Sequence, residues 1–149
     1  KIKTDMNAEK KPMSIAKLGQ FRQEASDIKT IDTAADTAAL LDEISKEARN
    51  TASAVEAALK EAETLLSAGQ RGKAYDAANL AYFLDPSTKA RRDELSSKAS
   101  EDAYAAGLKA EAIGDWRASR AAFEDAFHIN PELKDVKTKA EDARTKDTL

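Results

Sequence analysis

The residue types that could carry out chemistry are few and isolated in this sequence. His128 is the only histidine, it lies between Phe127 and Ile129, and the chain has no cysteine. A metal site needs several ligands of this kind, and a hydrolytic triad needs a nucleophile and an orienting acid around its base. No pattern around His128 supplies these groups. We therefore expect a structural or surface role for this histidine.

Acidic pairs and glycines give no catalytic pattern either. Glu101 and Asp102 could be imagined as acid and base, but such pairs are common on solvated helix faces. Residues 69–72 contain two glycines without the spacing of a phosphate-binding loop and without a preceding strand. Trp116 follows a glycine turn and is expected to pack in or beside the core. We predict no catalytic residue, no metal site, no cofactor and no small-molecule substrate, and expect that the protein is not an enzyme.

Composition favours an all-α fold in one domain. The 149 residues include only 5 Gly and 3 Pro, while alanine, leucine and charged residues dominate. No run alternates apolar and polar residues as a half-buried strand does. The 24 basic and 27 acidic residues are mixed along the chain, so nucleic acid is not an expected partner. No apolar stretch approaches the roughly 18 residues that suggest a membrane span.

The first part of the chain, residues 1–31, is predicted to be an arm that carries one short helix. Residues 1–12 are polar and end in proline, which is typical of a flexible segment. A short amphipathic helix is predicted from residue 14 to residue 28, and it needs a surface to dock against. That surface can belong to the same chain or to another copy. The anchors expected for self-association are Ile15, Leu18, Phe21 and Ile28.

Residues 32–149 are predicted to form a helical domain. One apolar stripe continues without a helix breaker from the possible N-caps Asp32 and Thr33 as far as Gly69, which predicts a single long helix. Gly and Pro mark the limits of the helices that follow. The predicted helices span residues 32–68, 70–85, 87–113, 115–130 and, as a cap, 132–148.

The domain contains an internal repeat with an offset of 45 residues. Gly69 aligns with Gly114, and Pro86 aligns with Pro131. Small and bulky positions between these markers align as well, as in the pairs Ala77 and Ala122, Ala78 and Phe123, Ala81 and Ala126, and Tyr82 and Phe127. A glycine turns the chain, small residues allow close helix packing, and Asp-Pro or Asn-Pro ends the hairpin. One hairpin cannot bury its own apolar face, so such units stack.

The second copy resembles a tetratricopeptide repeat through Gly107, Phe123, Ala126 and Pro131. This resemblance implies an α-solenoid of helical hairpins that binds other polypeptides. The copies depart from the family in period, 45 residues against about 34. The additional eleven or so residues, about three helical turns, lie before residue 100 and lengthen the helix there. We therefore expect elongated helices, possible coiled-coil-like extensions among them.

By the same resemblance, the inner face of each first helix holds the partner. The positions implied are Glu56, Leu59, Glu63, Leu66, Glu101, Tyr104, Leu108 and Glu111. They predict a groove with an apolar floor and an acidic rim, suited to a basic amphipathic segment of another protein. The alternative is that these side chains pack against neighbouring helices of the same chain.

Two functions follow from these patterns. The first is a scaffold or assembly subunit whose repeats bind a partner polypeptide. The second is a structural subunit of a large complex or filament that self-associates through its N-terminal arm.

Overall fold

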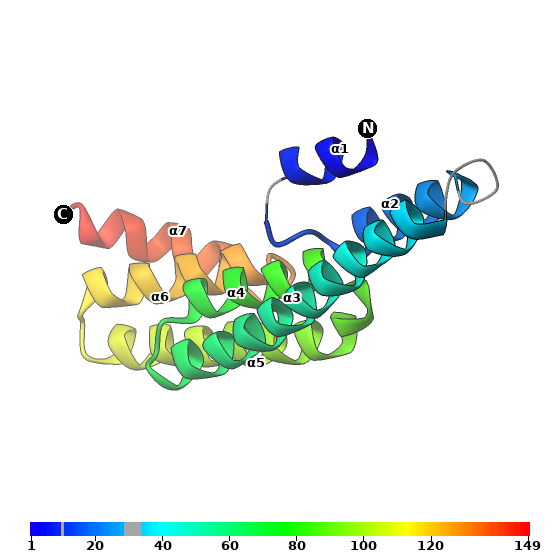
Figure 1. Cartoon of the computed structure of the whole chain (residues 1–149). Coiled ribbons are helices and arrows are strands. Elements are labelled where there is room, and N and C mark those ends of the chain that lie inside the picture. The colour runs from blue at the N-terminus through cyan, green and yellow to red at the C-terminus, as the bar shows by residue number, and fades with distance from the viewer. Residues whose placement is uncertain (10, 29–33) are drawn as a thin grey trace. The chain divides into compact units, whose positions relative to one another are not determined.

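The computed structural model describes the backbone of residues 1–9, 11–28 and 34–149, and the side chains of these residues except 28 and 34–36. Within the described residues all regular structure is helical, and no strand occurs (Figure 1). The predicted all-α class is confirmed. The helices are α1 (Ile2–Ala8), α2 (Ile15–Ile28), α3 (Ala34–Ser67), α4 (Arg71–Leu84), the 3₁₀ helix η1 (Pro86–Thr88), α5 (Lys89–Ala112), α6 (Trp116–Ile129) and α7 (Val136–Asp147).

The two repeat copies share one helix-ending motif. Gly69 and Gly114 have φ angles of 76° and 73°, in the left-handed region that favours glycine. After α3, the amides of Gly69 and Gln70 donate to the carbonyls of Leu66 and Leu65. After α5, Gly114 and Asp115 make the same pair of bonds to Glu111 and Ala110. Both helices therefore end in a Schellman motif.

Differences from the predicted helix bounds have local causes. The helix predicted from residue 87 begins at Lys89, because Pro86–Thr88 forms η1. The carboxylate of Asp85, which precedes η1, accepts a bond of 3.0 Å from the Ser87 amide. The cap predicted over 132–148 begins at Val136. Before it, the Asn130 side chain accepts a bond from the Glu132 amide, and Lys134 adopts a φ of 45°. The predicted caps Asp32 and Thr33 lie outside the described residues.

Residues 2–8 are helical, whereas the sequence predicts a flexible segment there. They form α1, whose Ile2 and Met6 lie one helical turn apart and are almost fully buried. Their neighbours in one apolar cluster include Leu18 and Phe21 of α2. Burial of these two large side chains stabilises a helix that is too short to be stable alone.

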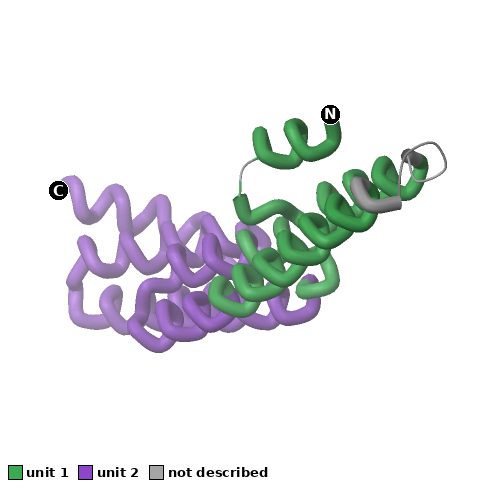
Figure 2. The backbone as a smooth tube through the Cα atoms, viewed as in Figure 1, with its two compact units in different colours: residues 1–58, 80–88 green, residues 59–79, 89–149 purple. Residues whose placement is uncertain are grey.

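The chain divides into two compact units (Figure 2). Unit 1 comprises residues 1–58 and 80–88, and unit 2 comprises residues 59–79 and 89–149. Helices α3 and α4 contribute residues to both. This division differs from the predicted one at residue 32, because the N-terminal residues pack with the first part of α3.

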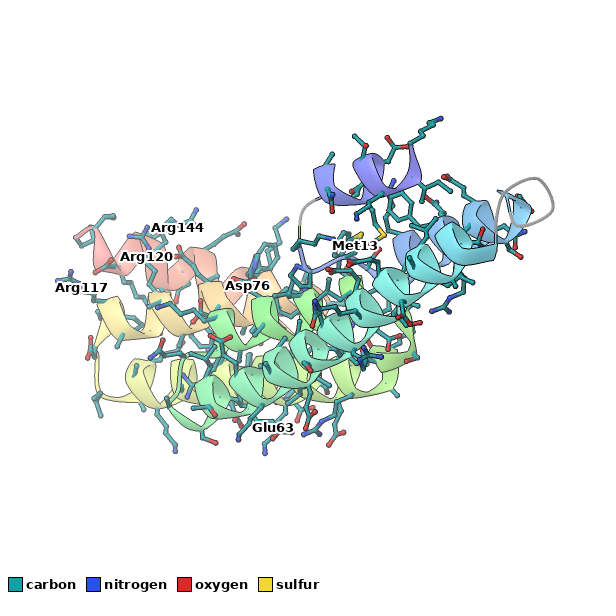
Figure 3. The ribbon with its side chains drawn as sticks, in the orientation of Figure 1. Met13, Glu63, Asp76, Arg117, Arg120 and Arg144 are labelled. Carbon is teal, nitrogen blue, oxygen red and sulfur yellow. The ribbon has the colours of Figure 1, made fainter. Side chains whose placement is uncertain are left out.

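Unit 1 has its core between α1, α2 and α3. Leu18 and Phe21 are buried with Ile44 of α3, so the short helix docks within its own chain. The buried Thr51 hydroxyl of α3 donates a bond of 2.5 Å to the carbonyl of Met13, a residue labelled in Figure 3. This bond fixes the segment that precedes α2 on α3.

Unit 2 contains two hairpins, residues 59–79 and residues 89–129, followed by α7. A glycine lies at one close contact between α5 and α6. Gly107 of α5 lies against the ring of Phe123 of α6, and the Ser119 hydroxyl donates a bond of 3.3 Å to the Gly107 carbonyl. The buried apolar residues of α7 pack with this pair of helices, and they are Val136, Ala140 and Ala143.

In the part of the chain that the structure describes, no helix combines the length and apolarity that crossing a bilayer requires.

Candidate functional site

The predicted groove positions on α3 have different surroundings. Glu56 and Glu63 are exposed, Leu59 is half-buried, and Leu66 is buried in a core cluster. Glu63 and Leu66 do line a cavity of about 280 Å³ with residues of α5. Its other lining residues are Ser67, Arg91, Glu94, Leu95 and Lys98. The structure thus places two of the predicted positions in a cavity between α3 and α5.

This α3–α5 cavity has a rim of mixed charge. Glu63 forms an ion pair with Arg91, which also pairs with Glu94 at 2.9 Å. Lys98 adds a second cation to the lining. Because Glu63 is engaged by a cation of its own chain, this rim is less acidic than the sequence alone predicts.

On α5, two of the four predicted positions bond to Asp135, the N-cap of α7, and to Lys139 of α7. The Tyr104 hydroxyl donates a bond of 2.5 Å to Asp135, and Glu111 pairs with Lys139 at 2.6 Å. The bond to Glu111 raises the pKa of Lys139, and the bond from Tyr104 lowers the pKa of Asp135. These groups join α5 to α7. For Tyr104 and Glu111 the structure therefore shows the alternative, in which the side chains pack within their own chain.

The remaining two positions on α5 are exposed. Leu108 retains 39% of its surface, and Glu101 is also exposed. The groove formed by all eight predicted residues therefore stays a prediction.

Two of the four residues predicted for a self-association arm are engaged within the chain. Leu18 and Phe21 are buried, whereas Ile15 keeps 41% of its surface exposed. The side chain of Ile28 lies outside the described residues. An interaction through this helix therefore has Ile15 as its accessible anchor.

An open apolar groove in unit 1 is the clearest candidate site, and the sequence analysis did not predict it. The groove has a volume of about 350 Å³ and lies between the segment that leads into α2 and the last turn of α4. We call it the unit 1 groove. Its lining residues are Glu9, Lys11, Pro12, Met13, Ser14, Lys17, Leu80, Phe83 and Leu84.

Two large apolar side chains of α4 are exposed in the unit 1 groove. Leu80 keeps 51% of its surface exposed and Phe83 keeps 71%, and both come from the same helical turn. Met13 and Leu84 beside them are buried and anchor the floor. Solvent exposure of adjoining large apolar groups is typical of an interaction surface.

Lysines dominate the rim of this groove. Lys17 pairs with Glu9 at 3.0 Å, and Lys11 pairs with Glu47 at 3.4 Å. Of the second pair, the lysine side chain is 40% exposed and the glutamate 16%, so the cation is the outer partner. The groove therefore combines apolar walls with two accessible ammonium groups.

The repeat alignment contains a pattern that distinguishes these residues. At the offset of 45 residues, Leu80 aligns with Asp125 and Phe83 aligns with His128. A buried role shared by both copies would need apolar residues in both. These two positions are therefore apolar in one copy only, and their exposure is seen only in the folded chain.

The residues considered for catalysis have surface environments. His128 is exposed, lies 3.9 Å from Asp76, and meets the ring of Tyr75 edge-on at 5.5 Å. Trp116 is half-buried beneath the ammonium of Lys146, 4.2 Å from its ring centre. Among the described side chains no group of three or more His, Asp or Glu is arranged to hold a metal ion.

No protein-family model, curated protein or solved structure matches this chain.

Proposed function

We propose that this protein is a non-catalytic scaffold or assembly subunit that binds another polypeptide, built from stacked hairpins of the tetratricopeptide type. The repeated glycine turns at residues 69 and 114 and the close contact between Gly107 and Phe123 support the hairpin architecture. Arrays of this kind offer extended surfaces to protein partners.

The observation that carries the proposal is the exposure of Leu80 and Phe83 in the unit 1 groove. If a partner covers these two side chains, their apolar surface is removed from water. Each Å² of apolar surface removed contributes about 25 cal/mol to the favourable free energy. Aromatic side chains in such grooves are frequent binding hot spots.

A basic amphipathic segment remains the partner proposed for the first helices of the repeats. The exposed Glu56 and Glu101 favour it, because each adds a carboxylate to the surface that faces solvent. Glu63 and Glu111 favour it less, since each has a cation of this chain as its partner.

Self-association through the N-terminal arm is the second candidate. The exposed Ile15 favours it, because this residue follows Ser14 of the unit 1 groove directly. A second copy could then cover Ile15 together with the groove.

Comparative affinity purification tests the proposal. The wild-type chain, a Leu80→Ser/Phe83→Ser variant and an Ile113→Ser control would each be recovered from the native source, with mass spectrometry of what co-purifies. Ile113 is matched as an apolar side chain that is 82% exposed and lies outside the groove. We expect the same stoichiometric partner with the wild-type and Ile113→Ser chains and its loss with the double variant. Equal recovery with all three would contradict the unit 1 groove as the binding site.

A further inference from the structure

We propose that the occupant of the unit 1 groove is an acidic amphipathic helix of a partner protein, with apolar anchors on one face and Asp or Glu beside them. This inference rests on the proposed function, because it names the chemistry of the polypeptide that the groove takes.

The apolar part of the argument begins with α4. Leu80 and Phe83 are three residues apart, so their side chains project from neighbouring places on one helix face. Pro12 and Met13, which precede α2, also line the groove. An apolar lining from both segments favours a partner that presents apolar side chains along one line, and a helix does so at every third or fourth residue.

The charges of the lining residues indicate the charge of the partner. Lys11 and Lys17 outnumber Glu9 among the lining residues, although the whole chain has a formal charge of −3. The side chains of both lysines are about two-fifths exposed, at 40% and 38%. Lys17 is paired with Glu9, and Lys11 is paired with the less exposed Glu47, so these charges are partly balanced within the chain. Carboxylates of a partner can still reach both ammonium groups, whereas among the lining residues a basic partner would meet one carboxylate, that of Glu9.

A helix suits this surface better than an anionic membrane does. The apolar side chains line a hollow rather than a protruding face, and the described lining residues include only two lysines to hold a charged lipid surface. Each such lysine contributes only about 1 kcal/mol to the attraction of an anionic membrane. The hollow therefore favours inserted side chains.

Two synthetic peptides test the sign of the partner. Each would have about 18 residues, enough to form a helix, with leucines along one face. One carries glutamates beside the leucines and its twin carries lysines there. Fluorescence anisotropy with the full chain at low and high salt would give both dissociation constants. We expect the acidic peptide to bind about tenfold or more tightly than the basic one at low salt.

Matched variants locate the binding. Leu80→Ser/Phe83→Ser should weaken binding of the acidic peptide about tenfold or more, and Ile113→Ser should leave its dissociation constant unchanged. Lys11→Gln/Lys17→Gln should weaken it about three- to tenfold at low salt only. Lys60→Gln/Lys109→Gln is the control for charge, because both of these lysines are exposed and outside the groove.

The outcomes separate the inference from the proposed function. Tighter binding of the basic peptide, lost with Leu80→Ser/Phe83→Ser, would overturn the acidic partner and support the groove as a polypeptide site. Binding of both peptides unaffected by that variant would overturn the inference, while the native purification decides the proposed function separately. Sedimentation of the chain with phosphatidylserine vesicles, dependent on Phe83 and stronger than peptide binding, would assign the groove to a membrane surface and overturn the inference.

Discussion

The ring of Phe123 lies so close to Gly107 that a side chain at position 107 has no room. A Cβ placed there would lie 2.6 Å from two carbons of the ring. Phe123 is completely buried, and the ring of Tyr104 packs against it at a centroid distance of 5.6 Å. This contact sets the separation of α5 and α6 in unit 2.

Gly107→Ala should therefore destabilise the protein. Overpacking a rigid core costs about 1–3 kcal/mol, which should appear as a lower free energy of unfolding in urea. Gly19→Ala is the control, since a Cβ at residue 19 would meet no atom within 4 Å. In α2 that change should stabilise by about 0.5–1 kcal/mol. A neutral Gly107→Ala would contradict the tight contact.

The two glycine turns should respond alike to substitution. Gly69 and Gly114 end their helices with positive φ and with the same pair of hydrogen bonds. Alanine at either position should lower stability by about 1–2 kcal/mol, the cost of the left-handed conformation. Thermal unfolding of each single variant measures this. A loss at only one position would mean that the two turns are not equivalent.

Glu124 should stabilise the protein in a pH-dependent manner. Hydrogen bonds from Arg144 of α7 and Arg120 of α6 lower the pKa of Glu124 below its ordinary 4.5. Figure 3 shows these two arginines on the adjoining helices. The stability from a lowered carboxyl pKa is present above the ordinary value and is lost as pH falls through the folded-state value.

Glu124→Gln should remove this stability, roughly 1 kcal/mol or less because the group is partly solvated. Urea unfolding at pH 7 and at successively lower pH measures it, and the difference between the wild-type and variant chains should shrink as pH falls below 4.5. Glu132→Gln, at an exposed position, should change little at either pH. A difference that persists at low pH would argue against the ion pairs as its source.

Asp125, which follows Glu124, should affect stability with the opposite pH dependence. Burial raises the pKa of Asp125 above 3.8, so its ionised form is disfavoured in the folded state. A raised carboxyl pKa gives a stability term that is present at low pH and is lost as pH rises through the folded-state value. Asp125→Asn should therefore be as stable as the wild type or more stable at pH 7. Urea denaturation of this variant beside Glu124→Gln tests the contrast, and a marked loss of stability would contradict it.

The groove residues should be separable into binding and folding roles. Leu80→Ser and Phe83→Ser should each change the free energy of unfolding by less than about 0.5 kcal/mol, because both side chains are exposed. Leu84 is only 2% exposed, and Leu84→Ala should cost about 2–5 kcal/mol. Chemical denaturation of the three variants tests this. A large loss with Phe83→Ser would mean that the ring is structural.

The helices were predictable because their causes are local. Gly69 and Gly114 mark turns that only glycine makes easily, and the apolar stripe up to Gly69 defines α3. Helix α1 was not predicted, since its polar composition conceals the buried pair Ile2 and Met6. A pair four residues apart stabilises a helix only if a surface covers it.

The site was less predictable because it depends on tertiary contacts. Glu63 pairs with Arg91, and Glu111 pairs with Lys139, each across 28 residues of sequence. No periodicity shows such pairs. Similarly, Phe83 continues the apolar pattern of α4, and only its surroundings in the folded chain show that it is 71% exposed.

Site-specific photo-crosslinking from position 83 is the most direct test of the central claim, that this protein binds a polypeptide in the unit 1 groove. A photo-reactive amino acid would replace Phe83 in one chain and Ile113 in a control chain, each expressed in the native source. We predict one defined polypeptide adduct from position 83 and none of that mass from position 113. The same adducts from both positions, or none from position 83, would contradict the claim.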